Sequence, residues 1–148
     1  MSASEQARGP TLDITLLSFN IDILEQFRQS ICALSEDQNN WGFNGAHSSV
    51  GKHTLQIIDD YLCFLSGIPS RTETGSGLLE IHYDQRPRDE DIETSRFSAI
   101  NALLDCEQRL CNLSLNTRQL SLSVYMSTHI EAPAVATDSS VERELVFL

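Results

Sequence analysis

The sequence is poor in positive charge. Lys52 is its only lysine, and 10 basic residues stand against 21 acidic ones, which gives a formal net charge of −11. Proteins that bind nucleic acid or anionic membranes neutralise phosphate groups with clusters of lysine and arginine. The few arginines here are scattered along the chain. We therefore expect neither nucleic acid nor a membrane as a partner.

The sequence also lacks the features of membrane-spanning, secreted, collagen-like and disordered proteins. No run approaches the roughly 18 apolar residues of a membrane-spanning helix, and residues 1–6 lack the apolar stretch of a secretory signal. Only 7 glycines and 4 prolines are present, and 41% of residues are hydrophobic, which excludes collagen-like and disordered chains. The sequence predicts one cytoplasmic domain over residues 1–148, with a disordered N-terminus at residues 1–12.

The cysteines show neither the spacing of a disulfide framework nor a Cys-x-x-Cys metal pair. All of them lie within apolar stretches of helical period, and a catalytic thiolate would need positive charge nearby. We predict that they are reduced thiols packed in the core. They are Cys32, Cys63, Cys106 and Cys111.

Three segments repeat apolar residues at steps of three and four, which is typical of amphipathic helices. They cover residues 16–34, 49–66 and 96–113. Ser48 or Ser49 is expected to cap the second helix, Gly67 to help end it, and Thr94 or Ser95 to cap the third. The expected core positions are Leu17, Ile21, Leu24, Ile31 and Leu34 in the first helix, Val50, Ile57, Ile58, Tyr61, Leu62 and Leu65 in the second, and Phe97, Ile100, Leu103, Leu104, Leu110 and Cys111 in the third.

Strand signals follow the third helix. Residues 120–126 alternate apolar and polar side chains, as half-buried strands do, and residues 131–137 are a candidate partner strand. A short extended piece is expected within residues 77–83. Ser139 and Glu142 form a capping box, so a fourth helix should begin near Ser140, only eight residues before Leu148. The expected fold is mainly α, an up-and-down four-helix bundle with a long crossover connection, a short β insertion and an incomplete fourth helix.

The crossover connection carries charges of alternating sign at Asp84, Arg86, Arg88, Asp89 and Glu93. Charges in such an order can neutralise one another. We expect mutual ion pairs that hold the connection in place, in preference to a substrate-binding role.

Three ordered blocks resemble the DinB/YfiT-like family of small helical-bundle proteins, and one bacterial branch in particular. Ser49-Val-Gly-Lys-His-Thr-Leu-Gln-Ile-Ile-Asp-Asp-Tyr61 is similar to that branch's Ser-Ile-Gly-x-His-x-x-His-x-x-Asp-His-Tyr segment. Tyr83-Asp-Gln-Arg-Pro-Arg-Asp89, with Ile92-Glu-Thr94 beyond it, is similar to its Tyr-Asp-x-Arg-x-Arg-Asp linker and the Glu-Thr that follows. Ser139-Ser-Val-Glu-Arg-Glu-Leu-Val-Phe-Leu148 is similar to its Ser-x-x-x-Arg-Glu-Leu-x-Phe-Leu segment.

The resemblance implies a divalent-metal site of zinc or nickel, held by one histidine of helix two and by a His-x-x-x-His pair of helix four. His53 matches the first ligand, but Gln56 and Asp60 stand where the branch has further histidines. The sequence stops at Leu148, before the region that would carry the pair. His53 is thus the one candidate metal ligand, and no bound metal is expected for the chain as written. The alternative is that His53 is a polar residue at the edge of the core stripe. The other histidines are His47, His82 and His129, in predicted loops or strand edges.

Three functions remain open at this point. The first is a DinB-like bundle protein of undefined activity with a degenerate or incomplete metal site. The second is a metal-dependent enzyme, a thiol transferase or hydrolase-like protein, completed by a partner chain or by residues beyond Leu148. The third is an interaction module, in which the incomplete fourth helix leaves an apolar groove for a helix of another molecule or for a homodimer. A Ser-His-Asp grouping of Ser49, His53 and Asp60 has little weight, since any helix rich in Ser and Asp permits it.

Overall fold

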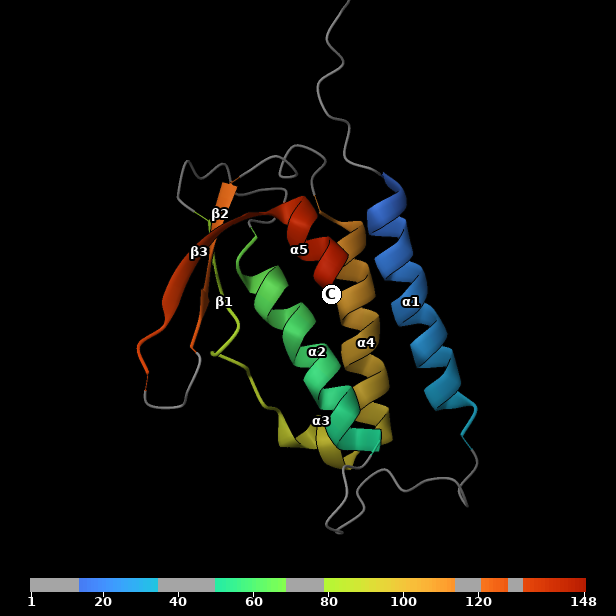
Figure 1. The fold of residues 1–148 in the computed structure, drawn as a ribbon. Helices are drawn as coiled ribbons and strands as arrows, with labels where there is room; N and C mark the ends of the chain where they lie inside the picture. The colour runs from blue at the N-terminus through green and yellow to red at the C-terminus, as the bar shows by residue number, and fades with distance from the viewer. Residues whose placement is uncertain (1–13, 35–49, 69–78, 114–120, 128–131) are drawn as a thin grey trace, which may run out of the picture.

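The computed structural model describes residues 14–34, 50–68, 79–113, 121–127 and 132–148 (Figure 1). In this part of the chain the fold is mainly helical with one small sheet, as predicted. The helices are α1 (Ile14–Cys32), α2 (Val50–Ser66), α3 (Glu90–Thr94), α4 (Arg96–Cys111) and α5 (Val141–Phe147). The strands are β1 (Leu79–His82), β2 (Ser121–Met126) and β3 (Val135–Ser140).

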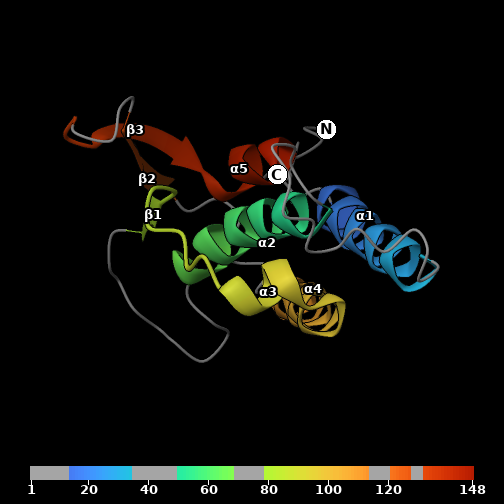
Figure 2. The same ribbon diagram turned by 90° about the horizontal axis from the view of Figure 1, so that it is seen from below.

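The three long helices lie side by side, with α4 in contact with both α1 and α2 (Figure 1). The short helix α3 packs against α2 and α4, and α5 contacts α1. Figure 2 shows α5 on one side of α2 and α3 on the other. None of the helices in the described segments is both long and apolar enough to cross a membrane.

The sheet has the strand order β1-β2-β3 and contacts α2 through β1. β1 runs parallel to β2, with Leu79 opposite Leu122, and β2 runs antiparallel to β3, with Ser121 opposite Ser140. β1 lies within the extended piece expected at residues 77–83, and β2 lies where the alternation predicts it, whereas β3 begins at Val135 and ends at Ser140, later than expected. Because β3 leads directly into α5, the sheet determines where the last helix starts.

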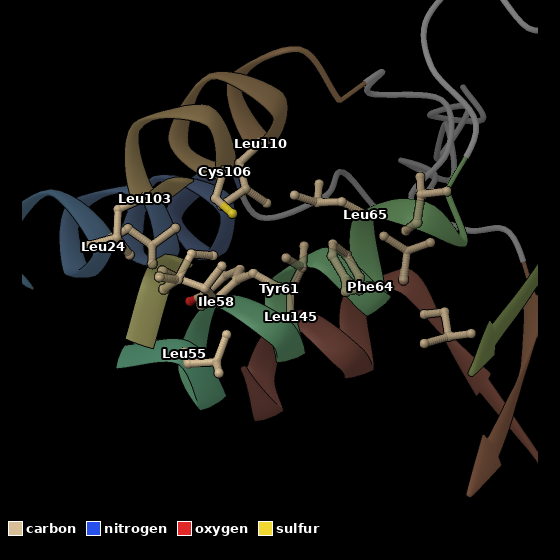
Figure 3. Packing of buried hydrophobic residues seen from close by; sticks show 14 of the residues in the cluster. Leu24, Leu55, Ile58, Tyr61, Phe64, Leu65, Leu103, Cys106, Leu110 and Leu145 are labelled. Atoms are coloured by element: carbon tan, nitrogen blue, oxygen red, sulfur yellow. The ribbon is translucent and has the colours of Figure 1, made fainter. Parts of the chain in front are cut away.

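The core lies between the helices and extends to the sheet. Figure 3 shows Phe64 of α2, Leu110 of α4 and Leu145 of α5 among the side chains of this one interior. Several predicted core positions are buried, namely Leu24, Ile31, Ile58, Tyr61, Leu65, Leu103 and Leu110. Other predictions were wrong, because Val50, Ile57, Phe97, Leu104 and Cys111 are exposed, Phe97 at 75%. On α2 the buried arc includes Leu55, Asp59 and Phe64, since α3, α4 and β1 surround that helix.

The prediction of four buried cysteines holds for two of them. Cys63 and Cys106 are buried, whereas Cys32 and Cys111 are exposed. Each exposed cysteine is the last residue of its helix. Burial raises the pKa of the Cys106 thiol to about 12, so this thiol stays protonated and packs as an apolar group.

Two of the predicted helix starts can be compared with the structure. Ser95 caps α4, because its hydroxyl accepts a hydrogen bond from the Ser98 N–H at 3.3 Å. The capping box of Ser139 and Glu142 was wrong by one residue, since Ser140 caps α5 by accepting from the Arg143 N–H. Several predictions fall on residues outside the described ones: the N-terminus 1–12, the caps Ser48 and Ser49, and His47 and His129.

Gly67 follows the last residue of α2, as predicted, but its position also meets a packing requirement. A Cβ atom at this residue would lie 2.5 Å from the carbonyl oxygen of Glu80 and 2.7 Å from Cγ1 of Ile81. Real Cβ atoms do not approach a backbone carbonyl so closely. The absent side chain therefore lets β1 pack directly on the end of α2.

Among the described residues, no ion pair joins two charges of the crossover connection, and its arginines contact α2 instead. Arg86 forms an ion pair with Asp60 of α2, and the Arg88 N–H donates to the buried Asp59 carboxylate at 3.3 Å. Asp84 accepts a hydrogen bond from the Ser127 N–H, and Asp89 caps α3. The arginines of the connection thus interact with acidic residues of α2 and not with those of the connection. The predicted mutual ion pairs were therefore wrong.

Candidate ligand-binding cavity

A cavity of about 400 Å³ lies between α2, α5, the sheet and the turn after β1. Volumes of this order are typical of sites for small organic molecules. Its lining combines charged and hydroxyl groups with three apolar side chains. The lining residues are Asp60, Tyr83, Arg86, Val124, Met126, Thr137, Asp138, Ser139, Arg143, Glu144 and Leu148.

The apolar part of the lining follows from the geometry of the strands. Successive side chains of a strand point to opposite faces, so Val124 and Met126 of β2 share one face. Thr137 lies directly opposite Val124 on β3, and it lines the same cavity. Leu148 adds a further apolar group. One wall of the cavity can therefore receive the hydrocarbon part of a ligand.

Glu144 of α5 is the most buried carboxylate in this lining, with 8% of the residue exposed. Its oxygens each accept one hydrogen bond from a hydroxyl group. The Tyr83 O–H donates to Oε2 at 2.7 Å, and the Ser139 O–H donates to Oε1 at 2.6 Å. The turn after β1 and the end of β3 thus hold the Glu144 side chain from two sides.

Tyr83 is fixed as a hydrogen-bond donor. Burial, together with the hydrogen bond to Glu144 and the charge of that carboxylate, raises the pKa of Tyr83 above its usual range. The phenol therefore keeps its proton at any physiological pH. Its role at this site is to orient Glu144 and not to exchange protons.

Asp60 and Arg86 form the second polar pair of the cavity. Arg86 Nη2 lies 3.3 Å from Asp60 Oδ1, and Arg86 Nε donates to the Tyr83 carbonyl oxygen at 3.3 Å. Burial raises the pKa of Asp60, and the nearby Arg86 charge partly offsets this shift. The arginine thus connects α2 to the turn that carries Tyr83.

A buried amide positions α5 against the helical core. Asn20 of α1 is 2% exposed, and its Nδ2 donates to the carbonyl oxygens of Leu145 at 2.8 Å and Leu16 at 3.0 Å. Its Oδ1 accepts from the Tyr61 O–H at 2.7 Å. Burial raises the pKa of Tyr61 to about 12, which keeps this donor protonated. Asn20 therefore joins α1, α2 and α5 next to Glu144.

The structure separates the residues that the sequence grouped on α2. His53 and Gln56 are exposed, whereas Asp60 lines the cavity. The polar residues that α2 does bury are Thr54 and Asp59.

The described residues do not fit the three-ligand metal site that the family resemblance implies. Across the described ranges, no three His, Cys, Asp or Glu residues come together as they would to hold a metal ion. His82 stacks on Tyr125 with ring centroids 4.5 Å apart, and its Nε2 lies 3.2 Å from Glu80 Oε2. A role for His53 as a metal ligand stays a prediction.

A second cavity of about 190 Å³ lies beside β1 and is lined by Cys63, Glu80, His82 and their neighbours. This grouping could suggest a reactive thiol. Burial, together with the charges of Asp59 and Asp60, raises the pKa of Cys63. The thiol is therefore protonated at neutral pH, which is the opposite of what a nucleophilic cysteine needs.

Comparison with protein-family models, with curated proteins and with solved structures gave no match. The function has to be argued from the chemistry of the site. Sequence reasoning had singled out Asp60 and Arg86 but missed Glu144 and Ser139 as site residues, and it used Tyr83 only within the family resemblance. One signal was available: Glu144 directly precedes the apolar residues Leu145 and Val146 and lies four residues after the pair Ser139-Ser140.

Proposed function

We propose that this protein binds a small organic molecule in the cavity between α2, α5 and the sheet. The observation that carries the proposal is that two oriented polar groups, Tyr83–Glu144–Ser139 and Asp60–Arg86, line the same 400 Å³ space as an apolar wall. Small-molecule sites combine an apolar surface with a few fixed polar groups, and groups with shifted pKa values gather in them. The cavity has these properties.

We further propose that the fold is of the DinB/YfiT-like type, an up-and-down four-helix bundle made of α1, α2, α4 and α5. The order of these helices supports this, as do the long connection that carries β1 and α3 and the β2–β3 pair that precedes α5. The three sequence blocks described above are the other support. Since the described residues do not bring three ligands together, we assign the protein a binding role and derive no metal-dependent step.

A substitution on β3 tests the proposed binding. Thr137→Trp places a large ring in the cavity, whereas Ala136→Trp adds the same ring on the neighbouring residue, which is outside the lining. We expect a set of neutral and charged aromatic fragments, screened by ligand-observed NMR, to contain binders of the wild type and of Ala136→Trp. Thr137→Trp should abolish their binding. Fragments that bind all three proteins equally, or none that bind the wild type, would overturn the proposal.

The second candidate function is that of an interaction module. Exposed apolar side chains on two helices support it. Phe19 and Ile23 of α1 are 59% and 43% exposed, and Ile57 of α2 is 37% exposed. A partner that covers these apolar side chains removes them from water, which lowers the free energy of the complex. We expect sedimentation velocity to detect a concentration-dependent homodimer that is weakened by Phe19→Ser. A protein that remains monomeric at high concentration would remove this candidate.

A further inference from the structure

We infer that the ligand of the cavity is a small organic cation, a primary ammonium group attached to an apolar body. This inference rests on the proposed function and adds the chemical class of the ligand. It starts from the charges of the lining, which contains the three carboxylates of Asp60, Asp138 and Glu144 and the two guanidinium groups of Arg86 and Arg143.

The three carboxylates of the lining differ in whether a positively charged side chain already pairs with them. Asp60 forms an ion pair with Arg86. Among the residues that the structure describes, neither Asp138 nor Glu144 takes part in an ion pair. The partners of Glu144 are two neutral hydroxyl groups, which orient its charge but do not compensate it. The cavity therefore contains negative charge that a cationic ligand could neutralise.

Glu144 also has hydrogen-bonding capacity left for a ligand. A carboxylate offers about four acceptor positions, two on each oxygen. Tyr83 uses one position on Oε2 and Ser139 uses one on Oε1. An ammonium group has three N–H donors, so it can fill the remaining positions without displacing either hydroxyl. Because Glu144 is only 8% exposed, water screens such a charged hydrogen bond weakly.

An anionic ligand fits this lining less well. The Arg86 guanidinium is already occupied by Asp60 and by the Tyr83 carbonyl oxygen. An anion would have to replace the Asp60 carboxylate and would then lie in the same cavity as Glu144 and Asp138. Arg143 is the other group that would favour an anion, so an anionic probe belongs in the test.

Three probes of nearly equal shape separate these possibilities: benzylammonium, benzyl alcohol and benzoate. Each has a phenyl ring for the wall formed by Val124 and Met126, and they differ in the charge of the polar end. Titrations followed by protein NMR at pH 7 and constant ionic strength give the three dissociation constants. We expect benzylammonium to bind about tenfold or more tightly than benzyl alcohol, and benzoate to bind most weakly.

Two matched variants locate the effect. Glu144→Gln keeps the size of the side chain and an acceptor oxygen but removes the charge, and Glu142→Gln removes an exposed charge of the same helix outside the lining. Glu144→Gln should weaken benzylammonium binding by about tenfold and leave benzyl alcohol binding within about twofold. Glu142→Gln should change neither. Should Glu144→Gln fail to fold, the exposed Asp138→Asn serves as the second variant, with a smaller loss of benzylammonium binding expected.

The outcomes distinguish this inference from the proposed function. Equal affinities for benzylammonium and benzyl alcohol would overturn the proposed ligand class but not the proposed binding in the cavity. Tighter binding of benzoate than of benzylammonium would have the same consequence. Equal losses in Glu142→Gln and Glu144→Gln would show that the net charge of −11, and not the cavity, attracts the cation. Binding of none of the three probes would overturn both the ligand class and the proposed function.

Discussion

The hydrogen bonds of Asn20 hold α5 on the helical core, and their removal should destabilise the protein by an amount that follows from the geometry. Asn20 and Tyr61 are each 2% exposed, so water cannot replace a lost partner. Tyr61→Phe removes the O–H that donates to Asn20 Oδ1 at 2.7 Å and leaves that oxygen without its donor. A buried polar group left without a partner costs about 1–3 kcal/mol. We expect the free energy of unfolding of Tyr61→Phe to fall by that amount.

A double-mutant cycle shows whether this loss comes from the Asn20 hydrogen bonds. Asn20→Leu keeps a side chain branched at Cγ with the same number of non-hydrogen atoms but leaves both the Tyr61 O–H and the Leu145 carbonyl oxygen unpaired, which predicts a cost of about 2–5 kcal/mol. The double variant removes the Tyr61 hydroxyl as well, so only the Leu145 carbonyl oxygen stays unpaired. Its cost should be about 1–3 kcal/mol, which is smaller than the sum of the single costs by about 2–5 kcal/mol.

Urea unfolding followed by far-UV circular dichroism measures these free energies, and hydrogen exchange of the α5 amides reports on the helix itself. Tyr125→Phe is the matched control, because the Tyr125 ring stacks on His82 and no hydrogen bond of its hydroxyl is found among the described residues. It should change the stability by less than about 0.5 kcal/mol. Additive single effects, or a Tyr61→Phe variant as stable as the Tyr125→Phe control, would refute the reasoning.

Three further predictions follow from contacts away from the cavity. Gly67→Ala should lower the free energy of unfolding in urea by about 1–3 kcal/mol, because the new Cβ would force β1 away from α2 at the Glu80 carbonyl; an unchanged urea midpoint would contradict this contact. Burial raises the pKa of Asp59 above its ordinary value of 3.8, so ionisation of this carboxyl costs stability as the pH rises past that value. Asp59→Asn, which removes the ionisation, should therefore gain stability relative to the wild type between pH 4 and pH 7, and a constant or opposite difference would refute this. In the native protein the two exposed cysteines should react readily with an aromatic disulfide reagent, and the two buried ones only upon unfolding in urea; fast reaction of all four thiols would disprove their assigned burial.

The helices could be predicted from the sequence because their signal is local. The period of the apolar residues placed α1, α2 and α4 within about two residues of their observed ends, and the hydroxyl of Ser95 marked the start of α4. Burial was predicted less well, since it depends on how many neighbours a helix has. Phe97 was predicted to belong to the core stripe of α4, yet it is 75% exposed near the start of that helix.

The cavity could not be predicted, because its parts meet only through the topology. Tyr83 and Glu144 are 61 residues apart in the sequence, yet their side chains share a hydrogen bond. This contact requires β1 to pair in parallel with β2 and β3 to return antiparallel before it continues into α5. Sequence patterns indicated the strands but neither their order nor their direction. The family resemblance contained the segments of Tyr83 and Glu144 but directed attention to histidines.

The different positions of His53 and Asp60 show why a pattern on one helix was not enough. The two residues are seven positions apart, which is about two turns, so they point in nearly the same direction around α2. Asp60 lines the cavity, whereas His53 is exposed. The reason is that β1 contacts α2, and α5 lines the same cavity as Asp60, so these elements surround that turn of the helix. Periodicity gives the angle of a side chain around a helix, but which turns are covered depends on segments distant in the sequence. For α2 this coverage decides which of two polar residues on one side belongs to the candidate site.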